Sequence, residues 1–271
     1  MANPASGRGT DPSPLLTALP GAEVFGPDEP ERVAAWKPER IVVAGGDGTI
    51  GGVAELAGRL DVPLAVIPTG TANDFARSNG IPLDPLEAAR LAASGTDLRP
   101  LELGRLATGR PFVNAASAGL ASVAGRRAQP LKSRFGPLAY GMGAARAAAT
   151  GEPLMVRVRV DGTEVYATDA WQVIVACTGA FGGGSEVEAD PHDGVLDVVI
   201  IEGSSRARLV QRAYGIRAGG IEGQSGVVTG EGRDVNVDTD GVTGFNVDGE
   251  VLTDEELHFT IEPRAFEVVV G

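Results

Sequence analysis

A glycine-rich turn between an apolar run and a helical pattern constrains the fold of this chain most strongly. Residues 39–45 read ERIVVAG, a run typical of a buried strand, and GGDGT occupies 45–49. Residues 49–60 follow at helical spacing. Ligands of open α/β sheets bind at the carboxyl edge, where such a turn lies. Glycines allow close backbone approach and a helix N-terminus offers unpaired N–H groups, so this segment predicts a phosphate-binding loop, with a plain tight turn as the alternative.

The same alternation of strand and helix continues to about residue 98. A second buried strand is expected at 63–68, a short helix at 71–81 and another helix at 85–95. Alternation at this spacing is typical of a parallel sheet with crossover helices. Residues 1–98 are therefore expected to form an α/β domain.

From residue 99 onward, the pattern changes to short alternating segments joined by turns. Two strands around a turn are expected within 98–117, and 155–167 predict a hairpin that turns on Asp161-Gly162. Many short strands predict a β-sandwich domain over residues 99–271. Further strands are expected at 171–179, 195–203, 235–252, 256–262 and 265–271, and helices at 137–150 and 206–220.

The composition limits the partners of the chain. A formal net charge of −13 over 271 residues argues against nucleic acid, because such binding requires cations that neutralise phosphates. No apolar run approaches the roughly 20 residues of a membrane span. The N-terminus lacks an apolar signal core, so a cytoplasmic location is expected. The single cysteine, Cys177, stands in an apolar segment and is expected to be a buried thiol.

One local cluster departs from the acidic character of the chain. The segment GRRAQPLKSR contains Arg126, Arg127, Lys132 and Arg134. Such a cluster is either an ordinary solvated surface or a contact for anionic lipid headgroups or nucleotide phosphates.

A second unusual loop, PTGTANDFAR at 68–77, follows the second strand and is expected beside GGDGT at the same sheet edge. Thr49 is expected to cap the first helix and to offer its hydroxyl to a phosphate. Asn73 and Asp74 open the next helix, where such side chains often serve only as caps. GGDGT is neither a Walker A loop nor GxGxxG. Together the two loops predict amide donors, hydroxyls and a carboxylate around one crevice.

Five motifs, in this order along the chain, resemble the bacterial diacylglycerol kinase-like lipid kinases, a family related to sphingosine kinases, NAD kinases and 6-phosphofructokinases. They are NPASG (3–7), GGDGT (45–49), PTGTANDFAR (68–77), GGGSEVEADPHDGVLDVV (182–199) and NVDGE (246–250). The resemblance covers nearly the whole chain. It implies an α/β nucleotide domain followed by a β-sandwich domain, which agrees with the pattern of expected elements.

The resemblance also implies ATP-dependent phosphorylation of a lipid hydroxyl, with ATP between the two domains. Glu250 matches the family's general base, a carboxylate that takes the proton of the attacking hydroxyl. From the residues alone, Asp248-Gly249 is a hairpin turn with Glu250 beside it. The residues implied for the nucleotide are Asn3, Gly45, Gly46, Asp47, Gly48, Thr49, Thr71, Asn73 and Asp74.

Magnesium is expected at two places. One ion accompanies ATP, and Asp47 and Asp74 are the carboxylates expected near it. The resemblance implies a second, structural ion held by Asp193 with backbone oxygens of Asp190 and Val195. The alternative is that this segment is a polar turn. The two histidines, His192 and His258, lie far apart in the sequence and are expected to be solvated or structural.

The chain departs from the family pattern at two places. It begins almost on NPASG, so the first strand is expected to be very short or its start misassigned. Gly51 and Gly52 stand where the family commonly has Asn-Glu, which removes two polar groups near the nucleotide or the substrate. The segment 133–147 is either a wall of the lipid cleft or ordinary helix packing.

An active kinase for a lipid alcohol is the leading hypothesis, with peripheral contact at the inner membrane face. Two alternatives are a nucleotide-binding sensor or scaffold without turnover and a kinase for a non-lipid hydroxyl such as that of NAD. Diacylglycerol, phosphatidylglycerol, a sphingoid base and a polyprenol-type alcohol all stay open as substrates. Exposed edge strands of the second domain would allow a homodimer.

Overall fold

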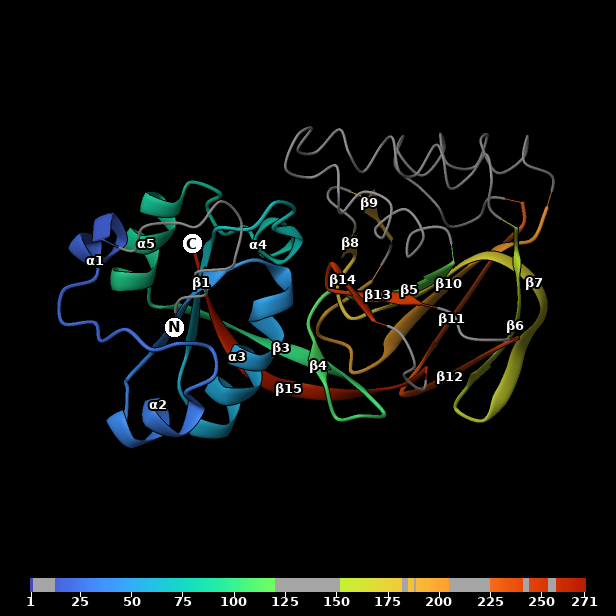
Figure 1. The fold of residues 1–271 in the computed structure, drawn as a ribbon, viewed down its shortest axis with the longest axis horizontal. Coiled ribbons are helices and arrows are strands. Elements are labelled where there is room, and N and C mark those ends of the chain that lie inside the picture. The colour runs from blue at the N-terminus through green and yellow to red at the C-terminus, as the bar shows by residue number, and fades with distance from the viewer. Residues whose placement is uncertain are drawn as a thin grey trace.

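The chain is described here by a computed structural model that covers residues 1, 13–119, 152–181, 185–187, 189–204, 225–240, 244–252 and 257–271. Figure 1 shows two lobes, one built of helices around parallel strands and the other built mainly of strands. Both chain ends lie in the helical lobe (Figure 1). The expected pairing of an α/β domain with a β-rich domain is therefore confirmed. The helices in the described ranges are α1 (Ser13–Ala18), α2 (Pro30–Trp36), α3 (Asp47–Leu60), α4 (Asp74–Ser78) and α5 (Pro85–Ser94).

Two parallel strands form the base of the α/β lobe. The strand β1 (Ile41–Gly45) alternates between buried and half-buried residues, whereas β2 (Leu64–Pro68) is buried throughout. A strand that is apolar along its whole length is typical of the interior of a parallel sheet, because both of its faces are covered. Helix α3 packs on β1, and α5 packs on β2. These contacts bury the apolar face of α3 that its spacing predicted.

The first residue lies beside β1. The N–H of Ala44 donates to the carbonyl of Met1 at 2.9 Å, and the amino group of Met1 donates to the carbonyl of Val42. Burial lowers the pKa of the Met1 amino group to about 6. Residue 1 thus takes the place of a neighbouring strand at this edge. Residues 2–12, which include NPASG and Asn3, lie outside the described ranges.

The strands of the β lobe form one continuous network with the α/β sheet, in the order β1-β2-β15-β12-β6-β7-β5-β13-β14, while β10 pairs with β7 and β11. The strand β7 changes partners along its length, from β6 in its first part to β5 and β10 in its second. The two short strands β8 and β9 pair separately. The bounds are β3 (Asp97–Leu106), β4 (Pro111–Phe112), β5 (Ala115–Gly119), β6 (Leu154–Val160), β7 (Thr163–Ala176), β8 (Ala180–Phe181), β9 (Ser185–Glu186), β10 (Leu196–Glu202), β11 (Val227–Gly232), β12 (Asp234–Thr239), β13 (Phe245–Val247), β14 (Glu250–Leu252) and β15 (His258–Val270).

Two long strands connect the lobes. The strand β15 pairs with β12 at one end and lies parallel to β2 at the other, through Val268 and Leu64. Its antiparallel partner β3 runs beside it along most of its length. Leu101 and Leu103 of β3 belong to the core of the α/β lobe, and Leu106 belongs to the core of the β lobe. The expected division between residues 98 and 99 falls inside β3, and the last strand of the chain returns to the α/β lobe.

Expected elements differ from the structure in extent at three places along the chain. The segments 155–167 and 171–179 were expected to be separated, but β7 continues from the hairpin through to Ala176. The segments 256–262 and 265–271 join as β15, with a shift of register after Glu262. The helix expected at 71–81 is only α4, because Asn73 has a left-handed backbone (φ 53°) and the helix can begin only after it.

Other expectations are confirmed, and some cannot be compared. Both turn residues of the hairpin at Asp161-Gly162 have positive φ, as this turn type requires. Cys177 is buried. No helix in the described ranges is long and apolar enough to cross a membrane. The expected helices at 137–150 and 206–220, and the basic cluster within 126–134, lie outside the described residues.

Candidate functional site

The GGDGT loop lies between the end of β1 and the start of α3. Gly45 ends the strand, Gly46 precedes the helix in an extended conformation, and the helix begins at Asp47. Thr49 therefore stands inside the first turn and is not the helix cap, contrary to expectation. Gly46 occupies the capping position and has no side chain that could cap the helix. The N–H of Thr49 donates to the carbonyl of Gly46 at 2.9 Å, and no side chain caps this end of α3, where the helix dipole favours an anion.

The second loop packs directly on the first. The N–H of Thr69 donates to the carbonyl of Gly45 at 2.9 Å. A Cβ added to Gly70 would lie 2.7 Å from the Cα of Gly46, so only glycine fits at this approach. The expected adjacency of the two loops at one sheet edge is present in the structure. Thr71 is exposed next to this contact.

Asn73 closes the second loop on itself. Its Oδ1 accepts the N–H of Gly70 at 2.9 Å, and its Nδ2 donates to the carbonyl of the same residue at 3.2 Å. It makes no side-chain capping bond to α4. Asn73 therefore shapes the loop, and its contact with a nucleotide stays a prediction.

Asp47 points inward from the GGDGT loop. The side chain is buried, and its Oδ1 accepts the N–H of Phe75 at 2.9 Å and the Nδ2 of Asn114 at 3.1 Å. Asp74, the first residue of α4, is also buried. Asp47 is thus held between the start of α4 and the connection between β4 and β5.

Asp248 anchors the late DGE turn. Its carboxylate accepts three consecutive backbone N–H groups, from Val113 at 2.8 Å, Asn114 at 2.9 Å and Ala115 at 3.2 Å. Burial raises the pKa of Asp248 to about 7, and the nearby charge of Asp47 acts in the same direction. The turn between β13 and β14 is therefore fixed to the β4–β5 connection, which in turn holds Asp47 through Asn114.

Glu250 begins β14 and faces the GGDGT loop. A Cβ added to Gly48 would lie 2.7 Å from Oε1 of Glu250. The other oxygen, Oε2, accepts from Nη2 of Arg110 in an ion pair, and the Glu250 side chain is 54% exposed. Gly48 and Glu250, which are 202 positions apart in the sequence, thus meet at the N-terminus of α3. Arg110 was missed by the sequence reasoning, because an arginine in a turn gives no signal of its own.

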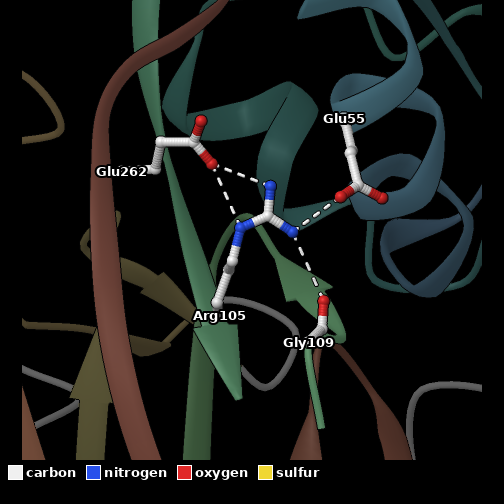
Figure 2. Close-up of polar contacts among 4 residues, drawn as sticks. All are labelled: Glu55, Arg105, Gly109 and Glu262. Atoms are coloured by element: carbon white, nitrogen blue, oxygen red, sulfur yellow. Dashed lines mark hydrogen bonds and ion pairs between the residues drawn. The ribbon is translucent and has the colours of Figure 1, made fainter. Parts of the chain in front are cut away.

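A second arginine links α3 to the turn that contains Arg110. In Figure 2, the guanidinium of Arg105 on β3 lies between Glu262 on one side and Glu55 of α3 on the other. Its Nη1 is 2.6 Å from Oε1 of Glu55 and 3.3 Å from the carbonyl of Gly109. This one side chain holds α3, the β3–β4 turn and β15 together.

The Gly51-Gly52 departure has a structural counterpart. A Cβ added to Gly51 would lie 2.9 Å from the carbonyl of Pro111, so this glycine allows α3 to approach β4. Gly52 faces open space and, with Gly48 and Thr49, lines a cavity of about 330 Å³. An Asn-Glu pair would crowd β4 at the first position and fill part of this cavity at the second.

The expected structural metal site is a tight turn before β10. Oδ1 of Asp193 accepts the N–H of Val195 at 3.0 Å, and the N–H of Asp193 lies 3.5 Å from the carbonyl of Asp190. The ring of His192 bonds the carbonyl of Pro100 at 3.0 Å. No three acidic, histidine or cysteine side chains converge on a ready metal site within the described part of the chain. The expected ligands of the structural ion are different, because they comprise one side chain, that of Asp193, and the backbone carbonyls of Asp190 and Val195.

Acidic side chains beside this turn suit a divalent cation. Glu102 and Asp197 each have one buried carboxylate oxygen without a hydrogen-bond partner. Burial raises the pKa of Glu102, and burial together with the charges of Asp193, Glu231 and Asp190 raises that of Asp197 to about 7. Concentrated carboxylate oxygens with unsatisfied lone pairs are the ligands that Mg²⁺ and Ca²⁺ prefer. The residues present therefore fit a metal ion at this turn.

Comparison with solved structures identifies the fold. A diacylglycerol kinase structure from Bacillus anthracis aligns with a TM-score of 0.78 at 21% identity, over 100% of this chain and 95% of that one. An NAD kinase from Archaeoglobus fulgidus in complex with ATP aligns with a TM-score of 0.52 at 17% identity, over 98% of this chain and 90% of that one. The chain has the NAD kinase-like fold, an α/β region followed by a β-rich domain.

Sequence comparison then identifies the family. Residues 26–106 match the diacylglycerol kinase catalytic domain, and residues 114–270 match the YegS C-terminal NAD kinase beta sandwich-like domain. The Pseudomonas aeruginosa PAO1 protein named "Probable lipid kinase YegS-like" is 34% identical, over 84% of this chain and 75% of its own. The diacylglycerol kinase of Bacillus subtilis is 33% identical, over 78% and 70%. The chain belongs to the family of diacylglycerol kinases and YegS-like lipid kinases.

Proposed function

We propose that this chain is an ATP- and magnesium-dependent kinase that phosphorylates the hydroxyl of a lipid alcohol. The observation that carries the proposal is the contact of Glu250 with Gly48. It brings an exposed carboxylate to the N-terminus of a helix whose preceding loop is suited to bind phosphate. A general base must lie within hydrogen-bond reach of the hydroxyl that it activates, next to the phosphoryl group that the hydroxyl attacks.

The two glycine-rich loops would hold the phosphates of ATP. Gly45, Gly46 and Gly48 leave the backbone of the first loop open, and the amides and dipole of α3 favour an anion there. Thr71 is exposed beside this loop and can offer its hydroxyl. Asn73 holds the second loop in shape through Gly70. Phosphate binding therefore depends mainly on backbone groups, which side-chain substitutions do not remove.

Glu250 would act as general base. As the hydroxyl oxygen forms its bond to the γ-phosphorus, the bond from phosphorus to the bridging oxygen of ADP breaks, and the hydroxyl proton passes to the Glu250 carboxylate. Glu250 suits this task because its side chain is half-exposed and one oxygen, Oε1, faces the GGDGT loop. Asp248, which is buried under three backbone N–H groups, positions the turn.

Magnesium would be bound at two places. At the phosphates, Asp47 and Asp74 are the carboxylates that would lie near an ion, which would neutralise the charge that develops there. At the turn before β10, Asp193 with the carbonyls of Asp190 and Val195 would hold a structural ion, and the unsatisfied acids Glu102 and Asp197 support it.

The family relatives favour a lipid acceptor over NAD. A lipid substrate requires the chain to reach a bilayer, so we propose peripheral contact with a membrane surface. Two rivals are a kinase for another hydroxyl, such as that of NAD, and a nucleotide-binding protein without turnover. Gly51 and Gly52 give the second rival its support, since they replace polar groups near the phosphate loop.

The test is transfer of label from γ-labelled ATP, with Mg²⁺, to a panel of acceptors. The lipid panel contains diacylglycerol, phosphatidylglycerol, a sphingoid base and a polyprenol in mixed micelles, and NAD and a reaction without acceptor are run beside it. Label in an extracted lipid supports the proposal and names the substrate. Label in NAD supports the first rival, and ATP binding without label in any acceptor supports the second.

A further inference from the structure

Arg110 is held rigidly at the edge of the candidate site. It ends the turn between β3 and β4, where the N–H of Leu106 donates to its carbonyl at 2.9 Å. Within the same turn, Gly109 donates to Leu106 at 2.8 Å and accepts from Arg105 at 3.3 Å. The backbone of Arg110 is therefore fixed, while its side chain is 31% exposed and able to change partner.

The side chain of Arg110 ends at Glu250, which lies against the GGDGT loop. Its Nη2 donates to Oε2 of Glu250, whose other oxygen faces Gly48. The Glu250 carboxylate thus contacts the guanidinium of Arg110 through one oxygen and the first turn of α3 through the other. Arg110 is connected through Glu250 to the loop where phosphate is expected, and the partner of its guanidinium is an exposed carboxylate.

Several acidic side chains lie around this region. Asp47 and Asp248 are buried nearby, and Asp74 precedes Phe75, whose N–H donates to Asp47. Arg110 supplies positive charge here through its ion pair with Glu250. An arginine fork binds phosphate more strongly than a partly solvated carboxylate, because phosphate has more charge and more acceptor oxygens.

We propose that Arg110 binds the terminal phosphate of ATP, and that Glu250 holds the guanidinium in place when the site is empty. The inference rests on the proposed function. It also couples the two residues during the reaction. When the hydroxyl proton passes to Glu250, the carboxylate loses its charge, and the charge of Arg110 is then directed to the phosphoryl oxygens alone. Positive charge at the transferred group is a recurring need of phosphoryl transfer.

The test compares the affinities for ATP and ADP, both with Mg²⁺ and without a lipid acceptor, by calorimetry. Arg110→Gln is expected to weaken ATP binding roughly ten-fold, the range of a charge-assisted hydrogen bond. Its effect on ADP should stay under about two-fold, because ADP lacks the terminal phosphate. Arg110→Lys should recover part of the loss, since lysine keeps the charge without the fork.

Glu250→Gln is expected to change ATP affinity in the opposite direction to Arg110→Gln. It removes the competing charge, so ATP should bind more tightly than to wild type while ADP is unchanged, and the double variant should resemble Arg110→Gln. Arg157 and Glu164 are a matched control, since they form an exposed pair at 3.0 Å on the β6–β7 hairpin. Arg157→Gln and Glu164→Gln should leave both affinities unchanged.

The outcomes separate the inference from the proposed function. If wild type binds ATP and Arg110→Gln leaves the ratio of ATP to ADP affinity unchanged, Arg110 does not bind the terminal phosphate, and the kinase proposal stands. Equal weakening of both nucleotides would also overturn the inference. If wild type binds neither nucleotide, both proposals fail.

Discussion

At the scale of single residues, the candidate site depends on glycines that leave room for other groups. Gly70 lets the two loops meet at Gly46, and Gly48 leaves space that Glu250 occupies. At such a position, the absence of a Cβ atom lets another group approach the backbone closely. The motif thus specifies both the backbone that would bind phosphate and the space for a carboxylate from the other lobe.

Gly48→Ala should separate activity from stability. The new Cβ would lie 2.7 Å from Oε1 of Glu250, and this flexible, half-exposed side chain would move away. Because alanine is favoured over glycine in helices, the free energy of unfolding should stay equal or rise by up to about 1 kcal/mol. Turnover should fall roughly ten-fold or more, since a general base acts only within hydrogen-bond reach. Chemical denaturation and steady-state kinetics measure the two effects.

The control for this variant is Gly52→Ala in the same helix, where no atom lies within 4 Å of the new Cβ. It should gain similar stability and keep wild-type turnover. Equal losses of turnover in both variants would mean that the position of Glu250 is not the cause.

Asp248 should make stability depend on pH. Its pKa is raised to about 7 in the folded chain from an ordinary value of 3.8. Between these two values the folded state binds more protons than the unfolded state, so this residue makes stability fall as pH rises from about 4 to 7. Asp248→Asn should remove this contribution. The stability advantage of wild type over the variant should then shrink across that range in urea denaturation, and an advantage that grows with pH would contradict the assignment.

The same variant should also destabilise the fold at low pH. An asparagine presents its NH₂ group to at least one of the N–H groups of Val113, Asn114 and Ala115, which leaves a buried donor without an acceptor. The expected cost at pH 4 is about 1–3 kcal/mol.

At the scale of elements, the strand and helix pattern predicted the α/β lobe well because each element there has its own periodicity and its own turn. The helix α5 begins and ends where its sequence signals lie: Asp84 accepts the N–H groups of Leu86 and Glu87 at 3.0 Å, and Gly95 follows the last turn. Prediction was weaker for β15. The Pro263-Arg264 step looked like a break, but the strand continues through it with Arg264 at a positive φ of 50°.

The elements of the site are connected by contacts that local patterns do not encode. Arg105 joins α3, β15 and the β3–β4 turn through Glu55, Glu262 and Gly109 (Figure 2). Glu55 lies 50 positions from Arg105 in the sequence and Glu262 lies 157 positions from it, whereas Gly109 is only 4 positions away. The periodicity of apolar residues predicts local secondary structure but not contacts between distant segments. Neither Arg105 nor Arg110 could therefore be identified as a site residue before the fold was known.

Arg105→Lys should weaken the connection between the lobes. A lysine has one charged nitrogen and cannot contact both glutamates and the Gly109 carbonyl as the planar fork does. The expected cost is about 1 kcal/mol in the free energy of unfolding. Arg157→Lys, at an exposed pair, should stay within about 0.5 kcal/mol of wild type. Equal effects of the two variants in urea denaturation would show that the Arg105 network adds no more than a surface ion pair.

At the scale of the whole molecule, the fold brings together loops and a carboxylate that lie in different lobes. The strands β3 and β15 pass through both cores, and β15 returns the end of the chain to β2. The family motifs marked GGDGT and Glu250 as partners through resemblance, but only the three-dimensional arrangement puts them in contact. The placement of Arg110 between the lobes, and the anchoring of Asp248, became visible only with it.

The most direct measurement of the central claim is the rate of phosphate transfer from γ-labelled ATP to the preferred lipid by Glu250→Gln, with Glu164→Gln as control. Both glutamates are about half-exposed and paired with an arginine, but of the two only Glu250 faces the GGDGT loop. We expect Glu250→Gln to lower kcat by roughly 10²-fold or more, the size of general-base contributions, while ATP binding persists. Glu164→Gln should match wild type. A Glu250→Gln variant that transfers phosphate at the wild-type rate would contradict the role proposed for this residue.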